Sequence, residues 1–204
     1  MHPKGEIIMI SGPVGSLEGR IVVNQSQGRW AVLCHPHPRF GGSMNNKVIT
    51  TVERALQQKG WSTLVFNFRG VGHSGGTYAQ GVGEQADLLA IIDWLRVHHP
   101  AEQLLLGGFS FGAYVSLQVW PKVEPDALLS IAPPVGLWDF AAIETPTLPW
   151  VVIQPGADEV VDPQAVWHWL SSLPVRPTLY WRSGVSHFFH RQLIWLRETI
   201  KLEY

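Results

Sequence analysis

Short apolar runs alternate with longer amphipathic stretches along the whole chain. Apolar runs of this length predict strands, and runs without polar alternation are typical of strands buried on both faces of a sheet. The first two runs are separated by a glycine-rich turn and are expected to pair antiparallel. We expect strands over 6–10, 17–24, 30–34, 61–67, 104–107, 126–132, 149–154 and 178–182.

The amphipathic stretches between these runs predict helices. Gly60 ends the first, and Asp162 with Pro163 gives another a favourable N-cap and first turn. Helices are expected over 46–59, 83–98, 113–120, 162–173 and 189–202. In the second of these, the positions spaced for a core face are Ala86, Leu89, Ala90, Ile92, Asp93 and Leu95.

Regular alternation of strands and helices predicts one doubly wound α/β domain over residues 1–204. Its central sheet should be mostly parallel, with helices on both faces. In such a fold, functional residues lie just past the carboxyl ends of the strands. Polar side chains at these strand ends are therefore the candidates for a functional site.

One strand end carries a nucleophile motif. Residues 104–107 form an apolar strand, Gly108-Phe109-Ser110-Phe111-Gly112 fits Gly-x-Ser-x-Gly, and an apolar helical stretch follows. This strand–turn–helix context is typical of a nucleophile elbow, in which a tight turn exposes the serine hydroxyl. A Cβ at either glycine would collide with the neighbouring strand or helix. The pattern predicts Ser110 as a nucleophile.

The same five-residue pattern occurs a second time, around Ser74. Gly72-His73-Ser74-Gly75-Gly76 is set off from the preceding strand by Arg69-Gly70-Val71, and no helical pattern follows it. Glycine-rich sequence of this kind indicates a loop. We therefore interpret Ser74 as a loop residue, and Arg69 as a residue that stabilises the loop at the edge of the site.

A serine nucleophile needs a base, and the base needs an orienting carboxylate, which follow in the order Ser, Asp or Glu, His in this kind of fold. Asp158 comes just past the strand 149–154, whereas Asp126 precedes its strand, Asp139 lies in a loop and Asp162 is explained as a helix cap. We expect Asp158 to be the carboxylate. Glu159 and Asp162 remain the alternatives.

The chain order places the general base among the histidines that follow Asp158. His187 comes after the last strand on a glycine-containing loop, which places it at the carboxyl edge. His168 lies inside a predicted helix between two tryptophans, and His190 is expected to belong to the closing helix. We therefore expect His187 to be the general base.

An acyl-transfer site also needs two backbone N–H groups that stabilise the developing oxyanion. The residue after the nucleophile, Phe111, is expected to supply one. The second should come from the loop after 30–34, where Pro36 and Pro38 have no N–H. His37 is favoured because it comes soonest after the strand. Arg39, Phe40 and Gly41 remain as alternatives.

The pair His35 and His37 has a second interpretation as a metal site. No third ligand accompanies the pair at short spacing, so we expect no metal or other cofactor. His35 is better explained as a brace that bonds backbone at the strand end. Cys34 is expected to be a buried strand residue.

Composition limits the partners. Of the 204 residues, 46% are hydrophobic and 15% are charged, and the net charge is −1. This indicates a large core and disfavours nucleic acid or an anionic membrane as the main partner. A single cysteine excludes an internal disulfide, and no apolar run has the length of a signal-peptide core or a membrane span. We expect a soluble cytoplasmic protein, as a monomer or homodimer.

Together these motifs resemble the α/β-hydrolase superfamily, and more narrowly the small lidless hydrolases related to dienelactone hydrolase. The narrower resemblance rests on His35-Pro36-His37-Pro38, on 41–48 (GGSMNNKV), on 67–72 (NFRGVG), on 108–112 (GFSFG), on Gly156-Ala157-Asp158 and on 184–189 (GVSHFF). Dienelactone hydrolases proper have cysteine at the elbow, where this chain has Ser110. The resemblance therefore does not extend to the dienelactone substrate.

The resemblance implies hydrolysis of small carboxylic esters or thioesters by Ser110, Asp158 and His187. Many members insert a cap domain after the sixth strand, but only 16 residues separate Ala132 from Pro149 here. We therefore expect an open site without a cap. The residues expected to line an apolar substrate groove are Phe40, Phe109, Phe111, Trp138 and Phe188.

Two other functions are compatible with the same residues. A peptidase or amidase uses the same triad on an amide bond. A binding protein on a hydrolase fold would keep the fold without the chemistry, because fold alone does not determine function.

Overall fold

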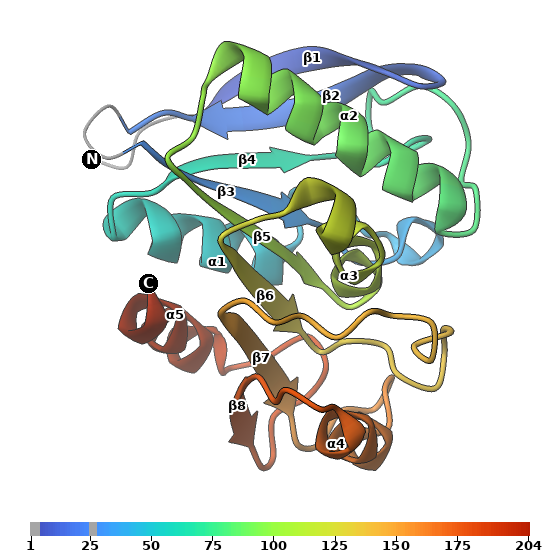
Figure 1. Ribbon diagram of the computed structural model, residues 1–204, viewed down its shortest axis with the longest axis vertical. Coiled ribbons are helices and arrows are strands. Elements are labelled where there is room, and N and C mark those ends of the chain that lie inside the picture. Colours follow the sequence, from blue (N-terminus) through green and yellow to red (C-terminus); the bar gives the residue numbers. More distant parts are fainter. Residues whose placement is uncertain (1–4, 25–27) are drawn as a thin grey trace.

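The strands form a single mixed sheet in the computed structural model, which describes residues 5–24 and 28–204 (Figure 1). Within these residues the sheet has eight strands in the order β1-β2-β4-β3-β5-β6-β7-β8. The pairs β1–β2 and β2–β4 are antiparallel, and every other neighbouring pair is parallel. The strands are β1 (Glu6–Gly12), β2 (Gly15–Val22), β3 (Arg29–Cys34), β4 (Ser62–Phe66), β5 (Gln103–Phe109), β6 (Ala127–Ile131), β7 (Trp150–Pro155) and β8 (Thr178–Arg182).

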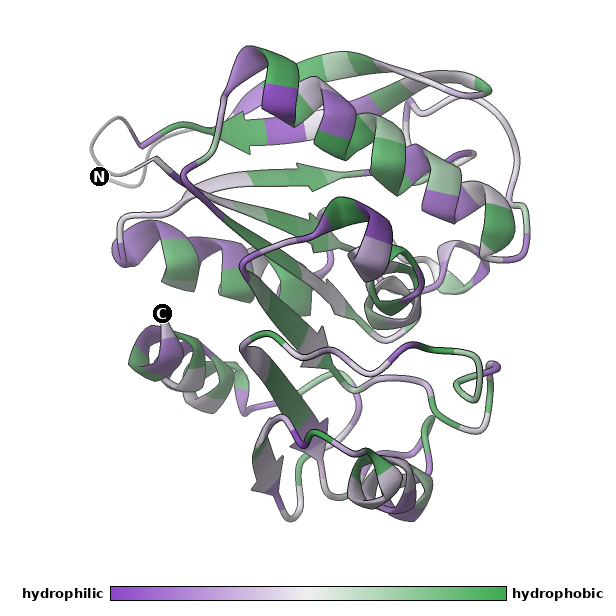
Figure 2. Cartoon of the chain, in the orientation of Figure 1, coloured by the Kyte–Doolittle hydropathy of each residue, from purple (hydrophilic) through white to green (hydrophobic). Residues whose placement is uncertain are grey.

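Helices cover both faces of the sheet and create two cores. One core packs the sheet against α1 and α5, and the other packs it against α2, α3 and α4. Figure 2 shows hydrophobic residues along the central strands and mixed hydropathy along the helices. The helices are α1 (Lys47–Gln58), α2 (Val82–His98), α3 (Phe111–Val123), α4 (Pro163–Ser172) and α5 (Leu193–Glu203), with a short 3-10 helix η1 (Pro38–Phe40). The predicted α/β architecture is confirmed.

Two details of the predicted helices are wrong. The closing helix begins at Leu193 instead of 189, because Phe189 and Arg191 have left-handed backbone angles, with φ of 55° and 59°. Residues 189–192 are therefore turns, and His190 precedes the helix. The backbone of a right-handed helix excludes positive φ, so the helix cannot extend back over these residues.

The core face of α2 is also shifted from the prediction. Asp93 is exposed, and the buried positions include two carboxylates, Glu84 and Asp87. The buried residues are Glu84, Asp87, Leu88, Ile91, Ile92 and Leu95. Carboxylates are buried when they have partners. The Glu84 carboxylate accepts hydrogen bonds from the N–H groups of Ala79 and Gly81 at 2.8 Å.

No cap domain covers the sheet. Residues 132–149, all of which the structure describes, connect β6 to β7 without a helix.

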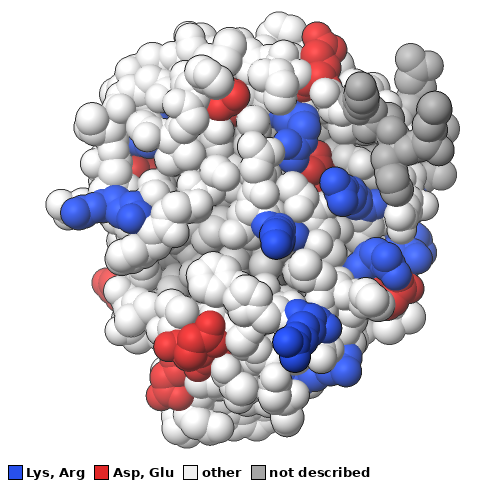
Figure 3. Space-filling model, turned by 180° about the vertical axis from the view of Figure 1, so that it is seen from behind, with Lys and Arg blue, Asp and Glu red and all other residues white. Residues whose placement is uncertain are grey.

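Seen from behind, acidic and basic side chains are scattered over a largely uncharged surface (Figure 3). In the part of the chain that the structure describes, no helix combines the length and apolar character needed to cross a membrane.

Candidate active site

Ser110 occupies a sharp turn between β5 and α3. Its backbone angles are φ 53° and ψ −118°, a conformation that a residue with a side chain rarely adopts. The Ser110 N–H donates a hydrogen bond to the carbonyl of Ile131 on β6 at 2.8 Å, which helps to hold the turn. Strain of this kind costs roughly 1–3 kcal/mol and persists only where surrounding contacts enforce it. The local structure is that of a nucleophile elbow.

The two elbow glycines are required by close backbone packing. A Cβ on Gly108 would lie 2.2 Å from the carbonyl carbon of Gly112, inside the same turn. A Cβ on Gly112 would lie 2.1 Å from the carbonyl oxygen of Cys34 on β3. Both distances are far below van der Waals contact, so the predicted collisions are confirmed.

His187 and Asp158 form a buried pair past the ends of β8 and β7. His187 Nδ1 lies 2.7 Å from Asp158 Oδ2, and the two side chains are 2% and 0% exposed. The other carboxylate oxygen accepts hydrogen bonds from the N–H groups of Val160 and Val161 at 2.9 and 2.8 Å. Because an ionised carboxylate only accepts hydrogen bonds, Nδ1 carries the proton and Nε2 keeps a free lone pair. This is the tautomer that a general base needs.

A second carboxylate fixes the backbone of the same loop. The His187 N–H donates to Glu159 Oε2 at 3.0 Å, so Glu159 binds the main chain of His187 and Asp158 binds its ring. Asp162 caps α4 by accepting from the N–H of Gln164. The structure thus gives the two alternative carboxylates structural contacts of their own.

Ser110 and His187 line one pocket of about 290 Å³. Within the described residues, no hydrogen bond joins the Ser110 hydroxyl to the His187 ring. Contacts of this type are often long before substrate binds. The other residues that line the pocket are Pro36, His37, Phe40, Gly41, Gly42, Asn46, Val160 and Phe188.

Two backbone N–H groups next to this pocket lack acceptors. Phe111 is the first residue of α3, where a helical N–H has no partner within the helix. His37 follows β3 and lines the pocket. In residues 5–24 and 28–204, neither N–H makes a hydrogen bond. Both N–H groups are therefore without an acceptor in the described protein, and their role in an oxyanion hole stays a prediction.

The side chain of His37 is held in place by its neighbours. Its Nδ1 accepts from the Arg39 N–H at 3.1 Å, so Nε2 carries the proton and donates to the Tyr78 hydroxyl at 3.0 Å. Burial lowers the pKa of His37, which favours this neutral form. The ring also packs against Phe111, with centroids 5.0 Å apart. No pattern in the sequence indicates this contact between His37 and Tyr78.

His35 braces the same loop from within the core. Its side chain is fully buried, Nδ1 donates to the Pro36 carbonyl at 2.6 Å, and Nε2 accepts from the Phe68 N–H at 3.1 Å. Burial lowers its pKa to about 4. Both ring nitrogens are used, which agrees with the brace and leaves neither for a metal. The neighbouring Cys34 is buried, and burial raises the pKa of its thiol.

The second Gly-x-Ser-x-Gly has a structural role. The Ser74 hydroxyl accepts from the Glu18 N–H at 2.9 Å and donates to the Asn67 carbonyl at 2.7 Å, so it joins β2 to the loop after β4. In the same loop, Arg69 makes a two-pronged ion pair with Asp87 of α2 at 2.9 and 2.7 Å. The interpretation of Ser74 and Arg69 as loop residues is confirmed.

The predicted aromatic residues divide into two groups. Phe40 and Phe188 line the pocket, and are 85% and 39% exposed. Phe109 is fully buried in the core beside α1 and α5, where it packs against the His187 ring at 4.9 Å instead of facing the pocket. Trp138 packs against Phe111 at 5.2 Å and does not line the pocket.

The remaining candidates lie outside the pocket. His168 is exposed on α4, and His190 is exposed in the turn before α5. Asp126 accepts from the Leu104 N–H at the opposite edge of the sheet, and Asp139 accepts from the N–H of Ala141 in its loop.

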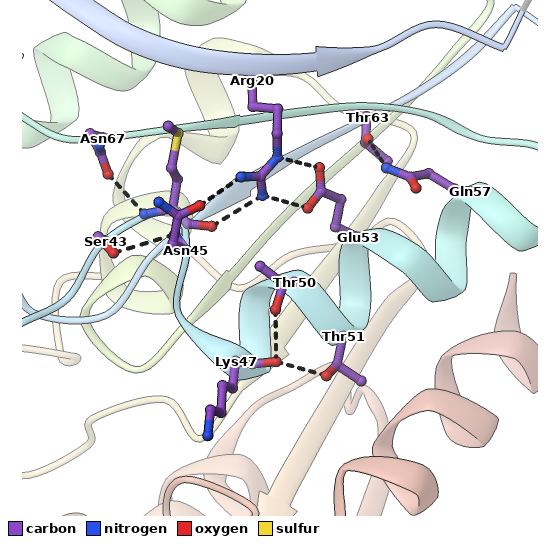
Figure 4. Close-up of polar contacts among 11 residues, drawn as sticks. Arg20, Ser43, Asn45, Lys47, Thr50, Thr51, Glu53, Gln57, Thr63 and Asn67 are labelled. Carbon is purple, nitrogen blue, oxygen red and sulfur yellow. Dashed lines mark hydrogen bonds and ion pairs between the residues drawn. The ribbon is translucent and has the colours of Figure 1, made fainter. Parts of the chain in front are cut away.

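One wall of the pocket is secured by a polar network that sequence reasoning missed (Figure 4). The Arg20 guanidinium on β2 donates to Asn45 Oδ1 at 2.7 Å and forms an ion pair with Glu53 of α1 at 2.6 Å. The Met44 N–H donates to Asn67 Oδ1 at 2.8 Å. These contacts fix the segment that precedes α1. This segment ends at Asn46, the N-cap of the helix.

Comparison with known proteins agrees with this geometry. A family model described as the alpha/beta hydrolase fold matches residues 37–145, and the chain belongs to this family. A lidless α/β serine hydrolase from Xanthomonas campestris, XC6422, is 46% identical, with a TM-score of 0.93 over 99% of this chain and 94% of that chain. An α/β serine hydrolase homologue from Coxiella burnetii is 41% identical, with a TM-score of 0.94 over 100% and 99%.

A sequence relative extends the comparison. An uncharacterized protein of Rickettsia prowazekii (strain Madrid E) is 39% identical over 160 residues, which is 76% of this chain and 67% of that protein. The chain therefore has the fold of the α/β serine hydrolases, without a cap domain.

Proposed function

We propose that the protein is a serine hydrolase that cleaves small carboxylic esters or thioesters. The observation that carries this proposal is the buried pair of His187 and Asp158, 2.7 Å apart, in a loop that shares a pocket with Ser110 on its elbow. A neutral imidazole with its proton fixed on Nδ1 is prepared to accept the hydroxyl proton at Nε2.

The proposed reaction has two halves. His187 Nε2 takes the proton of Ser110 as the hydroxyl oxygen attacks the acyl carbon, and Asp158 stabilises the imidazolium that forms. The N–H groups of Phe111 and His37 bind the oxyanion. The imidazolium then gives its proton to the departing alcohol or thiol, which leaves an acyl-serine. Water, deprotonated by the same imidazole, releases the acid and restores the hydroxyl.

The pocket supports a small substrate with apolar parts. Phe40, Val160 and Phe188 supply apolar surface, and the glycines of the β3 loop allow close approach to the backbone. Because residues 132–149 form no cap, the pocket is reached directly from solvent. We propose esters with short acyl chains as the first substrates to test.

The test is replacement of Ser110 by alanine. Ser110→Ala should lower the hydrolysis of p-nitrophenyl butyrate by at least about 10⁴-fold and abolish labelling by a fluorophosphonate. Ser116→Ala is the matched control, because Ser116 lies on α3, the helix that follows Ser110, and within the described residues its hydroxyl bonds only the Ala113 carbonyl. Normal turnover in Ser110→Ala would refute the assignment. Wild-type protein that neither labels nor hydrolyses would indicate a binding protein, and cleavage of amides in preference to esters would indicate an amidase.

A further inference from the structure

One polar side chain in the pocket has no role in the proposed reaction. Asn46 lines the pocket and is the N-cap of α1, where its Oδ1 accepts from the Val48 N–H at 2.9 Å. Its Nδ2 group makes no hydrogen bond within the described residues. The cap therefore uses one end of the amide and leaves the donor end free.

Helix capping does not explain why this residue is an amide. Serine and aspartate cap helices about as well as asparagine, and aspartate also interacts favourably with the positive end of the helix. Neither would place an N–H donor at this pocket wall. The distinguishing property of asparagine here is the pair of N–H donors on Nδ2.

The free amide is held in a defined position. Capping fixes Oδ1, and the Asn46 N–H donates to the Ser43 carbonyl at 2.9 Å. The preceding residues are held by Arg20 and Asn67, as drawn in Figure 4. A donor that is already ordered loses little entropy when it binds a ligand. Nδ2 is thus prepared to bind.

No carboxylate side chain is among the residues that line the pocket. Beyond Ser110 and His187, the lining residues with free N–H donors in the described part of the chain include Asn46, through Nδ2, and His37, through its backbone N–H. Phe40, Gly41 and Gly42 use their N–H groups within the β3 loop. Donors are complemented by acceptors, so an oxygen atom on the substrate fits this wall better than a hydroxyl or amine that must donate.

We propose that Asn46 determines specificity, by donating from Nδ2 to an acceptor oxygen that the substrate carries beyond its scissile ester. This inference rests on the proposed hydrolase function and narrows its substrates to oxygenated esters, such as those of keto acids or ether alcohols. A pocket built around a hydrogen bond disfavours an analogue without the acceptor, because the donor is then left unpaired.

The experiment compares matched ester pairs in wild type and Asn46→Ser. The acyl pair is p-nitrophenyl 4-oxopentanoate and p-nitrophenyl pentanoate, and the alcohol pair is 2-methoxyethyl butyrate and butyl butyrate. Serine keeps the cap and removes the amide. We expect kcat/KM of Asn46→Ser to fall about three- to tenfold more for the oxygenated member of one pair than for its partner. The affected pair reveals which part of the substrate reaches Asn46.

A second variant separates recognition from helix capping. Asn46→Asp keeps the cap and replaces the donor by an acceptor, so it should show an equal or larger selective loss. Equal losses on both members of both pairs, in both variants, would overturn the inference while leaving the proposed hydrolase intact. Absence of Ser110-dependent turnover on every ester would instead refute the proposed function.

Discussion

Gly112→Ala should destabilise the protein strongly, because the added methyl group meets backbone. The new Cβ would lie 2.1 Å from the Cys34 carbonyl oxygen, 2.5 Å from its carbonyl carbon and 2.7 Å from the His35 carbonyl oxygen. To reach even 3.0 Å, α3 and β3 would have to separate by about 1 Å in a region packed at crystal-like density. No flexible side chain is available to move aside.

The magnitude follows from the cost of overpacking. Forced backbone shifts in cores cost about 1–3 kcal/mol and occasionally more, and a contact with main chain belongs at the upper end. For a domain of about 200 residues, 1 kcal/mol lowers Tm by about 2–4 °C. We therefore expect Tm to fall by about 6–12 °C. Activity should fall as well, since the displaced carbonyls belong to the segment that leads to His37.

Gly19→Ala is the matched control for this substitution. Gly19 lies on β2 with ordinary backbone angles, and its Cβ would make only van der Waals contacts, the nearest at 3.5 Å. The same chemical change should there be neutral or slightly stabilising. Thermal unfolding of both variants, followed by tryptophan fluorescence, gives the comparison. A wild-type Tm in Gly112→Ala, or an equal loss in Gly19→Ala, would refute the steric reasoning.

Three further predictions use the buried polar groups. Asp158→Asn should lower kcat by about 10⁴-fold by destabilising the required imidazole tautomer, whereas Asp162→Asn, at an exposed helix cap, should keep activity. Arg69→Ala should lower the free energy of unfolding by about 3–5 kcal/mol in urea titrations, because it leaves the Asp87 carboxylate buried without its partner; a double variant with Asp87→Leu should recover part of this loss, and no recovery would contradict the argument. His35 has a pKa of about 4 in the folded protein and 6.5 as its ordinary value, so its contribution to stability is complete above about pH 6.5 and declines as the pH falls toward 4. Between pH 7 and pH 4.5 the decline amounts to about 2 kcal/mol, and it should be absent from His35→Gln when the two proteins are unfolded in urea at these pH values; parallel pH profiles would disprove it.

The fold was predictable because a parallel sheet leaves a simple signal. Strands buried on both faces are continuous apolar runs. The carboxyl ends of parallel strands meet at one edge of the sheet, and this rule predicts that Ser110, Asp158 and His187 lie close together. The predictions that were wrong concern residues whose contact partners are distant in the sequence. An aspartate in a helix normally indicates a surface position, but Asp87 is buried because it forms an ion pair with Arg69. No local pattern shows this pairing, so the predicted core face of α2 was wrong.

The side-chain details of the pocket were less predictable for a similar reason. Phe109 ends its strand facing the core beside α1 and α5, and alternation alone does not say which of two buried faces a residue occupies. The sequence pattern indicates Asn46 only as the start of a helix. Its second role depends on a pocket wall formed by loops distant in the chain, which no local pattern records.

The position of β8 has a consequence for biosynthesis and ageing of the enzyme. His187 follows β8, which comes last among the strands of the described residues and lies at an edge of the sheet, where these residues pair it with β7 alone. A nascent chain can thus complete most of the sheet while still lacking its proposed base. In the finished protein, an edge strand opens at lower cost than a central one. Loss of turnover should therefore precede loss of bulk structure when the protein is heated, which makes enzymatic activity an early reporter of damage at this edge.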